Sequence, residues 1–155
     1  MDMAVLKNAM ECNSTIAGII TQTNAREMII DSIIAKRYCE TEEQQLKFRY
    51  EILCKEFFLL SKKIEILKNI FKEIDEEKYE AMKKERHIDK LRLLLETRNK
   101  VAHGNIIHSQ QNNPRLYFNK ELLSIEELHD NFWNEIIPSV NDVLSYVGKY
   151  YKVTL

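Results

Sequence analysis

Apolar residues recur at steps of three and four along most of this chain, which is the spacing of one face of an α-helix. The first such pattern predicts a helix from about Ser14 to Tyr38, with Asn13 or Ser14 as its N-cap. Its apolar positions are Ile16, Ile19, Ile20, Met28, Ile29, Ile33 and Ile34. A stripe of this kind indicates a helix that buries one face against other elements.

The most regular pattern lies between Thr41 and Ile74, where apolar residues alternate steps of four and three over about four heptads. They are Leu46, Tyr50, Leu53, Phe57, Leu60, Ile64, Leu67, Phe71 and Ile74. Thr41 and Gln44 fit a capping box at the start. We therefore expect one helix roughly 50 Å long. Heptad spacing leaves open whether this seam packs within the chain or against a second chain.

The polar stretch "DEEKYEAMKKERHID" is expected to form a short helix or a turn with a solvated charged face. The next main helix is predicted to begin at about Lys83 or His87 and to end at His103. Gly104 follows directly and is expected to close that helix as its C′ residue.

The segment after Gly104 lacks helical periodicity, and "QQNNP" is a turn signal between "NIIH" and "RLYF". A small β-hairpin is therefore predicted near residues 106–118. The last helix is expected to start at Ser124, because Ser124 and Glu127 form an S-x-x-E capping box. Pro138 is expected to kink this helix near Asn134.

These elements predict an all-α fold, an up-and-down bundle of four to five helices in a single domain over residues 1–155. Composition agrees, since only 3 Gly and 2 Pro interrupt the chain. No apolar run is long enough to cross a membrane, and no signal-peptide pattern is present, so no membrane partner is expected. The 3 cysteines show no C-x-x-C spacing and fit reduced thiols in the cytoplasm.

Charge is nearly balanced, with 23 basic and 24 acidic residues and a net charge of -1. Any site for a polyanion must therefore be local, or be built by two chains together. Basic residues gather on both sides of residues 98–103 and could steer RNA or form an ordinary solvated surface balanced by Glu85 and Asp89. They are Lys83, Lys84, Arg86, Lys90, Arg92, Arg115 and Lys120.

An arginine lies inside the apolar stripe of the segment "LRLLLETRNKVAHGN". On a helical wheel, Arg98 falls about 20° from Leu91, near the centre of that stripe. An unpaired guanidinium in a core is very costly. Three roles for it remain open. It could pair with a buried carboxylate such as Glu51, Glu56 or Glu65, cap backbone carbonyls, or line a cleft that binds phosphate.

His103 ends the same helix, where a histidine is also favoured by the helix dipole alone. Beside Arg98, it suits metal-free cleavage of RNA. An imidazole moves protons near neutral pH, and a guanidinium stabilises charge on the phosphate attacked by the 2′-OH. Asn99, one turn before His103, could orient the imidazole or bind phosphate, and Arg92 is a further phosphate-binding candidate. His103 and His108 lack the companions of a metal site, so no metal or other cofactor is expected.

The stretch "RNKVAHG" resembles the signature of the HEPN superfamily. In that signature, four to six residues separate an arginine from a histidine, and the residue directly after the arginine is polar. The resemblance covers only Arg98 to Gly104 in specific residues. It implies that Arg98 and His103 are a catalytic pair, with Asn99 as the supporting polar position. One branch extends the motif to His-x-Tyr, and Asn105 stands at that place here.

HEPN domains are helical bundles that dimerise so that their two motifs face each other. Many are metal-independent endoribonucleases of toxin–antitoxin or phage-defence systems, controlled by a separate antitoxin or regulatory protein, whereas others are inactive modules that bind nucleotides or proteins. The resemblance thus implies RNA as substrate and a homodimer. Because five residues separate Arg98 and His103, they lie about 140° apart on a helix. We expect a two-fold axis, or unwinding at Ala102–Gly104, to complete the site.

Overall fold

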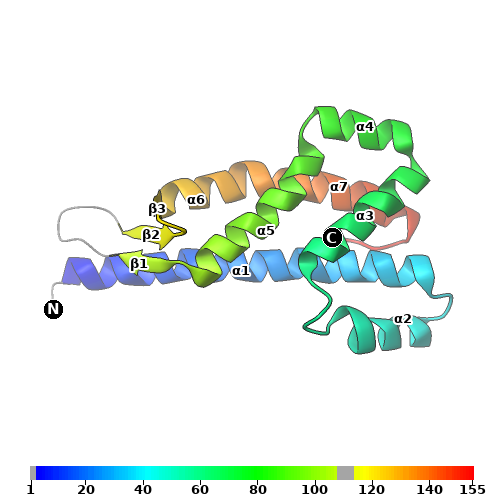
Figure 1. Ribbon diagram of the computed structural model, residues 1–155, viewed down its shortest axis with the longest axis horizontal. Helices are drawn as coiled ribbons and strands as arrows, with labels where there is room; N and C mark the ends of the chain where they lie inside the picture. Colours follow the sequence, from blue (N-terminus) through cyan, green and yellow to red (C-terminus); the bar gives the residue numbers. More distant parts are fainter. Residues whose placement is uncertain (1–2, 108–113) are drawn as a thin grey trace.

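The computed structural model describes residues 3–107 and 114–155, which form a mostly helical body with a small antiparallel sheet at one end (Figure 1). The helices are α1 (Met3–Tyr38), α2 (Glu42–Phe48), α3 (Leu60–Ile74), α4 (Glu76–Lys84), α5 (His87–His103), α6 (Ile125–Asn131) and α7 (Ile137–Tyr150). The strands are β1 (Asn105–Ile107), β2 (Arg115–Phe118) and β3 (Glu121–Ser124). The predicted all-α class with a small β insertion is confirmed.

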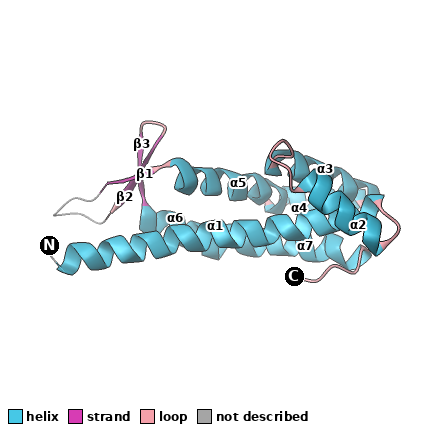
Figure 2. Ribbon diagram, turned by 90° about the horizontal axis from the view of Figure 1, so that it is seen from below, coloured by secondary structure: helices cyan, strands magenta, loops and turns pink. Residues whose placement is uncertain are grey.

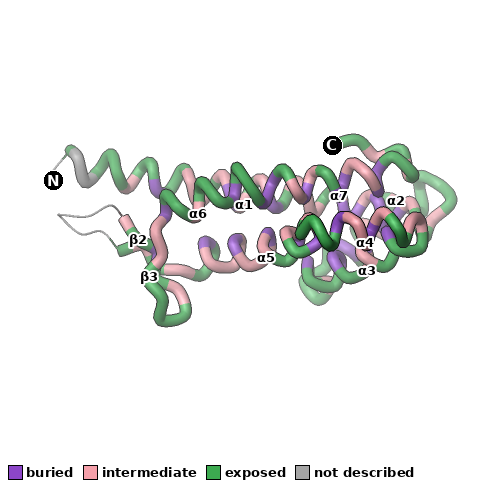
Figure 3. Tube along the Cα trace, turned by 90° about the horizontal axis from the view of Figure 1, so that it is seen from above, coloured by how far each residue is buried: buried purple, intermediate pink, exposed green. Residues whose placement is uncertain are grey.

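Helix α1 runs the length of the body, and α3, α5 and α7 pack along it (Figures 1 and 2). One core lies between these helices, and buried positions line the sides on which they face each other (Figure 3). Its fully buried members include Ile19, Ile30, Ile33, Leu67, Phe71, Leu91, Leu94, Phe132 and Val143. Among the described residues, no helix combines the length and the apolar character that crossing a bilayer requires.

Helix α1 begins at Met3, so the predicted N-cap at Asn13 or Ser14 is wrong. Cys12 explains the longer helix, because it is only 2% exposed and belongs to the core. Its side chain lies near Ile125 at the start of α6. The early turns of α1 are thus supported by packing against the sheet end of the molecule, which apolar periodicity within α1 does not reveal.

The single helix expected from Thr41 to Ile74 is broken. The capping box of Thr41 and Gln44 is present and starts α2, but α2 passes into a π-helical turn, η1 (Arg49–Leu53), and the chain leaves the helix before α3 begins at Leu60. The heptad stripe divides at this break. Leu60, Ile64, Leu67 and Phe71 are buried, whereas Leu46, Tyr50 and Phe57 are exposed.

The two halves of the stripe are covered to different extents. Helix α3, with 15 residues, packs against α1 and α5. Helix α2 lies back against α1 but has no buried residue, and in the first half of the stripe only Leu53, in η1, is buried.

Helix α5 ends at His103 as predicted, and Gly104 follows it, but not in the left-handed conformation of a C′ glycine. Gly104 has φ -78° and ψ 154°, an extended backbone. Glycine is required at this position because there is no room for a Cβ atom. A Cβ at this position would lie 2.6 Å from the carbonyl oxygen of Lys100 and 2.7 Å from Cδ1 of Leu116. The close approach seats β2 against the end of α5.

Gly104→Ala is expected to destabilise the protein by about 1–3 kcal/mol, the usual range for overpacking a filled site. The backbone angles suit alanine, so the loss comes from the contact with the Lys100 carbonyl and Leu116. Urea unfolding measures it. Gly18→Ala is the control with the opposite sign, because a Cβ at Gly18 meets only Trp133 at 4.0 Å and alanine favours a helix by about 0.5–1 kcal/mol. Equal effects of the two substitutions would contradict the steric explanation.

The predicted hairpin is present, since β1 pairs antiparallel with β2, with Asn105 opposite Tyr117 and Ile107 opposite Arg115. The turn between them, including His108, lies outside the described residues. A third strand, β3, was not predicted. It joins β2 through Asn119 and Lys120, whose φ angles of 49° and 67° are those of a tight type I′ turn.

The last helix starts at Ser124 as predicted, with the Ser124 hydroxyl accepting a hydrogen bond of 3.2 Å from the backbone N–H of Glu127. A kink was expected near Asn134, and the regular α-helix is interrupted there. Helix α6 passes into a π-helical turn, η2 (Phe132–Ile136), and α7 then begins with Pro138 in its first turn. Without an N–H at Pro138, the regular α-helical hydrogen bonds cannot run through this point.

The polar stretch after Ile74 forms α4, as one of the two predicted alternatives. Asp75 caps α4 by accepting a hydrogen bond from the N–H of Lys78, and it also accepts one of 2.5 Å from the hydroxyl of Tyr146 on α7. Both hydrogen bonds lower the pKa of the Asp75 carboxyl, and the bond from Tyr146 has the larger effect. Asp75 therefore joins α4 to α7.

Tyr146→Phe is expected to lower the urea midpoint at neutral pH and to leave it nearly unchanged in acid. Because Asp75 has a lowered pKa in the folded state, its contribution to stability is present above the ordinary value of 3.8 and is lost as pH falls through the folded pKa. Removing the hydroxyl removes the main cause of that lowering. Urea midpoints of the two proteins over a pH series measure the convergence, and a constant difference at all pH values would contradict it.

Candidate functional site

Arg98 lies at the border of the buried face of α5 rather than at its centre. The buried residues of α5 are Ile88, Leu91, Leu94, Thr97 and Val101. Arg98 is half-buried, and Ala102, which the wheel placed inside the apolar stripe, is exposed. The buried face is therefore rotated toward Thr97, and the side that carries Arg98 opens toward solvent near the end of the helix.

The contacts of Arg98 bear on the roles that the sequence left open. Its Nη1 donates a hydrogen bond of 3.2 Å to Oδ1 of Asn99. In the part of the chain that the structure describes, Arg98 forms no ion pair and no hydrogen bond to a carbonyl. Glu65 pairs with Lys68, and Glu51 and Glu56 are exposed. The carboxylate and capping roles thus lack support among the described residues, and the phosphate-binding role stays a prediction.

His103 is exposed as the last residue of α5. The helix is intact up to it, since the N–H of Gly104 donates to the carbonyl of Lys100 at 2.8 Å. The expected alternative of unwinding at Ala102–Gly104 is therefore wrong for this structure. Arg98 and His103 keep the divergence of about 140° that a helix imposes on them. Within one chain the two side chains leave the helix in different directions.

The supporting candidates have partners. The amide oxygen of Asn99 accepts its hydrogen bond from Arg98, so Asn99 orients the guanidinium. Arg92 donates to Glu96 at 2.7 Å in a pair one turn apart, and its side chain is 83% exposed. Exposed pairs of this kind are weak, so Arg92 remains free to exchange Glu96 for a phosphate.

The basic residues before Arg98 are largely balanced by acidic neighbours. Lys90, for example, donates to Glu135 at 2.9 Å. Further ion pairs join Lys83 to Glu80, Arg86 to Asp89 and Arg92 to Glu96. This pattern is that of an ordinary solvated surface, which was one of the two interpretations of these charges. It reduces the expected contribution of residues 83–92 to long-range attraction of RNA.

A buried ion cluster between α1 and α3 was not predicted. The ammonium of Lys63, which is 2% exposed, lies 2.6 Å from Oε1 of Glu27 and 2.9 Å from Oδ1 of Asp31. Burial by itself lowers the pKa of Lys63, but the hydrogen bonds to the two carboxylates outweigh it and raise the pKa. Burial raises the pKa of Asp31. The cluster is closed to solvent at Lys63, so its role is to hold α3 on α1.

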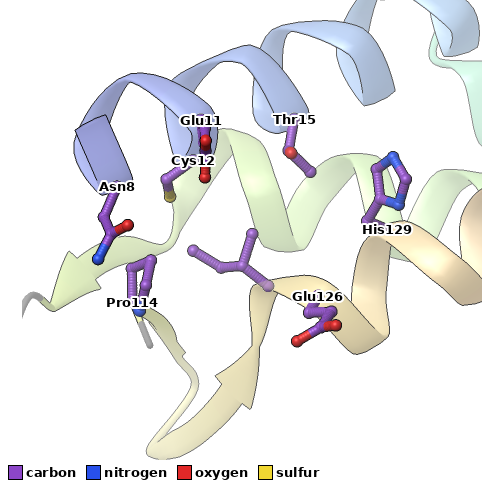
Figure 4. A pocket seen from close by; sticks show the side chains of 8 residues that line it. Asn8, Glu11, Cys12, Thr15, Pro114, Glu126 and His129 are labelled. Carbon is purple, nitrogen blue, oxygen red and sulfur yellow. The ribbon is translucent and has the colours of Figure 1, made fainter. Parts of the chain in front are cut away.

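A cavity of about 360 Å³ lies between the first turns of α1 and the start of α6 (Figure 4). Cys12 and His129 both line it, but they stand apart in Figure 4, with Thr15 between them. Burial raises the pKa of the Cys12 thiol, which makes the thiol a poor nucleophile. Among the described residues, no cluster of histidine, cysteine and acidic side chains could hold a metal ion. Neither observation points to thiol or metal chemistry in this cavity.

Comparisons of this chain with family models, with curated proteins and with solved structures gave no match.

Proposed function

We propose that this protein is a homodimeric, metal-independent endoribonuclease of a toxin–antitoxin or phage-defence system, with Arg98 and His103 as its catalytic residues. The observation that supports this proposal most directly is the burial and the contacts of Arg98. Its guanidinium is half-buried at the edge of the core, is oriented by Asn99, and has no carboxylate partner in the described residues. A guanidinium held in this way is available to bind an anion, and exposed His103 lies on the same helix end.

The chemistry needs only these groups and the RNA. One His103 imidazole accepts the proton of a ribose 2′-OH, and the resulting oxygen attacks the adjacent phosphorus. Arg98 stabilises the negative charge that develops on the phosphate oxygens. The bond from phosphorus to the 5′-oxygen breaks, and a second, protonated imidazole donates a proton to that leaving oxygen. The products are a 2′,3′-cyclic phosphate and a 5′-hydroxyl.

A dimer supplies what a single chain lacks. One chain brings a single motif histidine, whereas the reaction uses a base and an acid. The intact helix also directs Arg98 and His103 apart. Two copies of α5 related by a two-fold axis would place the Arg98 of one protomer near the His103 of the other and bring both imidazoles to one cleft.

The test is to incubate single-stranded RNA with the purified protein in EDTA and to analyse the ends of the fragments. Cleavage with 2′,3′-cyclic phosphate and 5′-hydroxyl ends is expected. Cleavage that needs an added divalent metal ion, or that leaves 5′-phosphates, would overturn the proposed mechanism. Growth arrest on expression, relieved by a separate antitoxin chain, is the expected result for the cellular role.

A second function is a catalytically inactive module that binds a nucleotide or a protein through the same helix end. The observation that favours it concerns His103, whose imidazole has no hydrogen-bond partner among the described residues that would set its tautomer. RNA binding without any cleavage in the assay above would select this function.

A further inference from the structure

The sheet that follows the Arg98–His103 helix has two chemically different faces. Successive side chains of a strand point to opposite faces, and residues directly opposite each other on paired strands share a face. The register therefore places Ile106, Leu116 and Leu123 together on one face. These three belong to the core or pack against it, and Leu116 is fully buried on Gly104. This is the inner face of the sheet.

The opposite, outer face remains open. By the same register it consists of two rows across the three strands: Asn105, Tyr117 and Leu122, and then Ile107, Arg115 and Ser124. Tyr117 is 41% exposed, Ile107 46% and Leu122 51%, and Arg115 is also exposed. Alternation in β2 is strict, since its two outward residues are exposed while Leu116 is buried. An aromatic ring and a guanidinium thus stand two residues apart on one strand.

The charge on this face indicates its occupant. Arg115 is its one charged residue, and the nearest strand carboxylate, Glu121, stands opposite Phe118 and so belongs to the inner face. If two copies of the sheet met outer face to outer face, each guanidinium would be buried without a carboxylate on that face to pair with. A single-stranded nucleic acid suits it better, because phosphates match Arg115 and bases stack on Tyr117.

The outer face is also close to the proposed site. Asn105, its first residue, follows His103 by two positions, so their Cα atoms are at most about 7 Å apart. Tyr117 lies directly across from Asn105, and such paired Cα atoms are about 4.5–5.5 Å apart. A nucleotide next to a phosphate bound at His103 can therefore reach Tyr117 of the same chain.

We infer that the outer face of the sheet is a binding platform for single-stranded RNA, on which Tyr117 stacks a base and Arg115 contacts a phosphate beside the cleaved bond. This inference rests on the proposed function for its substrate, and it adds the residues that hold the RNA outside the catalytic pair. The three strands after α5 are thus part of the proposed RNA site.

The test measures RNA binding without cleavage, in the His103→Ala protein with EDTA. The probe is a fluorescein-labelled single-stranded RNA of about 12 nucleotides. Tyr117→Ala is expected to weaken binding about fivefold or more, because stacking of a base on the ring is lost, while Tyr117→Phe keeps most of the affinity. Arg115→Gln is expected to reduce the slope of log Kd against log salt by about 0.7, the value for one phosphate contact on a single strand.

The matched controls are Arg37→Gln and Tyr38→Ala, an exposed arginine and tyrosine at the end of α1 far from the sheet (Figure 1). Both should bind RNA like the His103→Ala parent. If the parent binds RNA and the Tyr117 and Arg115 variants bind equally well, the platform is overturned and the proposed nuclease stands. If Tyr117→Ala leaves RNA affinity unchanged but changes the molar mass of the protein in light scattering, the outer face is an interface between copies of the chain. The platform is then overturned as well.

Two further outcomes separate the proposals. If the platform variants weaken binding as expected but the wild-type protein does not cleave RNA, the platform is supported and the nuclease fails. If the parent protein binds no RNA at all, both proposals are overturned.

Discussion

Replacing Arg98 or His103 by alanine is expected to lower the rate of RNA cleavage about 100- to 10,000-fold, the range found when a proton-transferring side chain or a donor that stabilises phosphate charge is removed. Neither substitution should unfold the chain. His103 is exposed, and Arg98 is only half-buried, with Asn99 as its one hydrogen-bonding side-chain partner in the described residues. Melting temperatures of the variants check this directly.

A mixed dimer tests whether both imidazoles are needed in one cleft. A dimer of one wild-type chain and one His103→Ala chain keeps both Arg98 side chains but holds one imidazole, whereas the proposed reaction uses a base and an acid. Such a heterodimer, purified through two different tags, should cleave at well below half the wild-type rate. Two independent sites, each built within one chain, predict about half the wild-type rate.

Controls with the same residue types exclude general effects of charge. Arg37 and His129 are exposed and lie outside the proposed site, so Arg37→Ala and His129→Ala should cleave RNA like the wild type. Full activity of both single motif variants would refute the assignment of the catalytic residues. A heterodimer that keeps half the wild-type rate would refute the shared cleft while leaving the residues in place.

Features with local signals were predicted well. The capping boxes at Thr41 and Ser124 mark helix starts that the structure has, and Pro138 marks the irregular turn before α7. The end of α5 at His103 was also predicted, although Gly104 is required there by the approach of Leu116 and not by a left-handed backbone. Short-range chemistry thus indicated where elements begin and end.

Features set by tertiary packing were missed. No glycine or proline marks the break after Leu53, and heptad spacing does not show that Leu46, Tyr50 and Phe57 stay exposed. Strand β3 was missed because its turn uses Asn119 and Lys120 in left-handed conformations without a glycine. At the site, periodicity placed Arg98 in the stripe, but only the packed fold shows that it lies at the border and contacts Asn99.

Lys63→Ala is expected to destabilise the protein by about 3–5 kcal/mol, because it leaves a buried carboxylate without its partner. The side chain of Asp31 is 5% exposed and that of Glu27 27% exposed, so Asp31 bears most of the effect. For a chain of this size the loss corresponds to a fall of about 6–20 °C in melting temperature. Lys68→Ala on the same helix is the control. Its bridge to Glu65 is on the surface, and its loss should be below about 1 kcal/mol.

The loss should depend on pH. Burial already raises the pKa of Asp31, and removal of the Lys63 ammonium removes the main opposing influence, so the folded-state pKa rises further. A group with a raised folded pKa contributes stability below its unfolded value and loses that contribution as pH rises through the folded pKa. Lys63→Ala should therefore be least destabilising in acid and most destabilising at pH values above the raised pKa of Asp31. Urea unfolding at about pH 5 and pH 8 measures the difference.

Removing both charges together should recover most of the stability that Lys63→Ala loses. In Lys63→Met with Asp31→Leu, apolar side chains of similar volume replace the buried pair, and Glu27 is exposed enough to turn toward solvent. Such replacements are often neutral or stabilising, because two desolvated charges are removed along with their attraction. If the double variant were as unstable as Lys63→Ala, an uncompensated carboxylate could not be the cause, and loss of packing around the Lys63 chain would be the explanation instead.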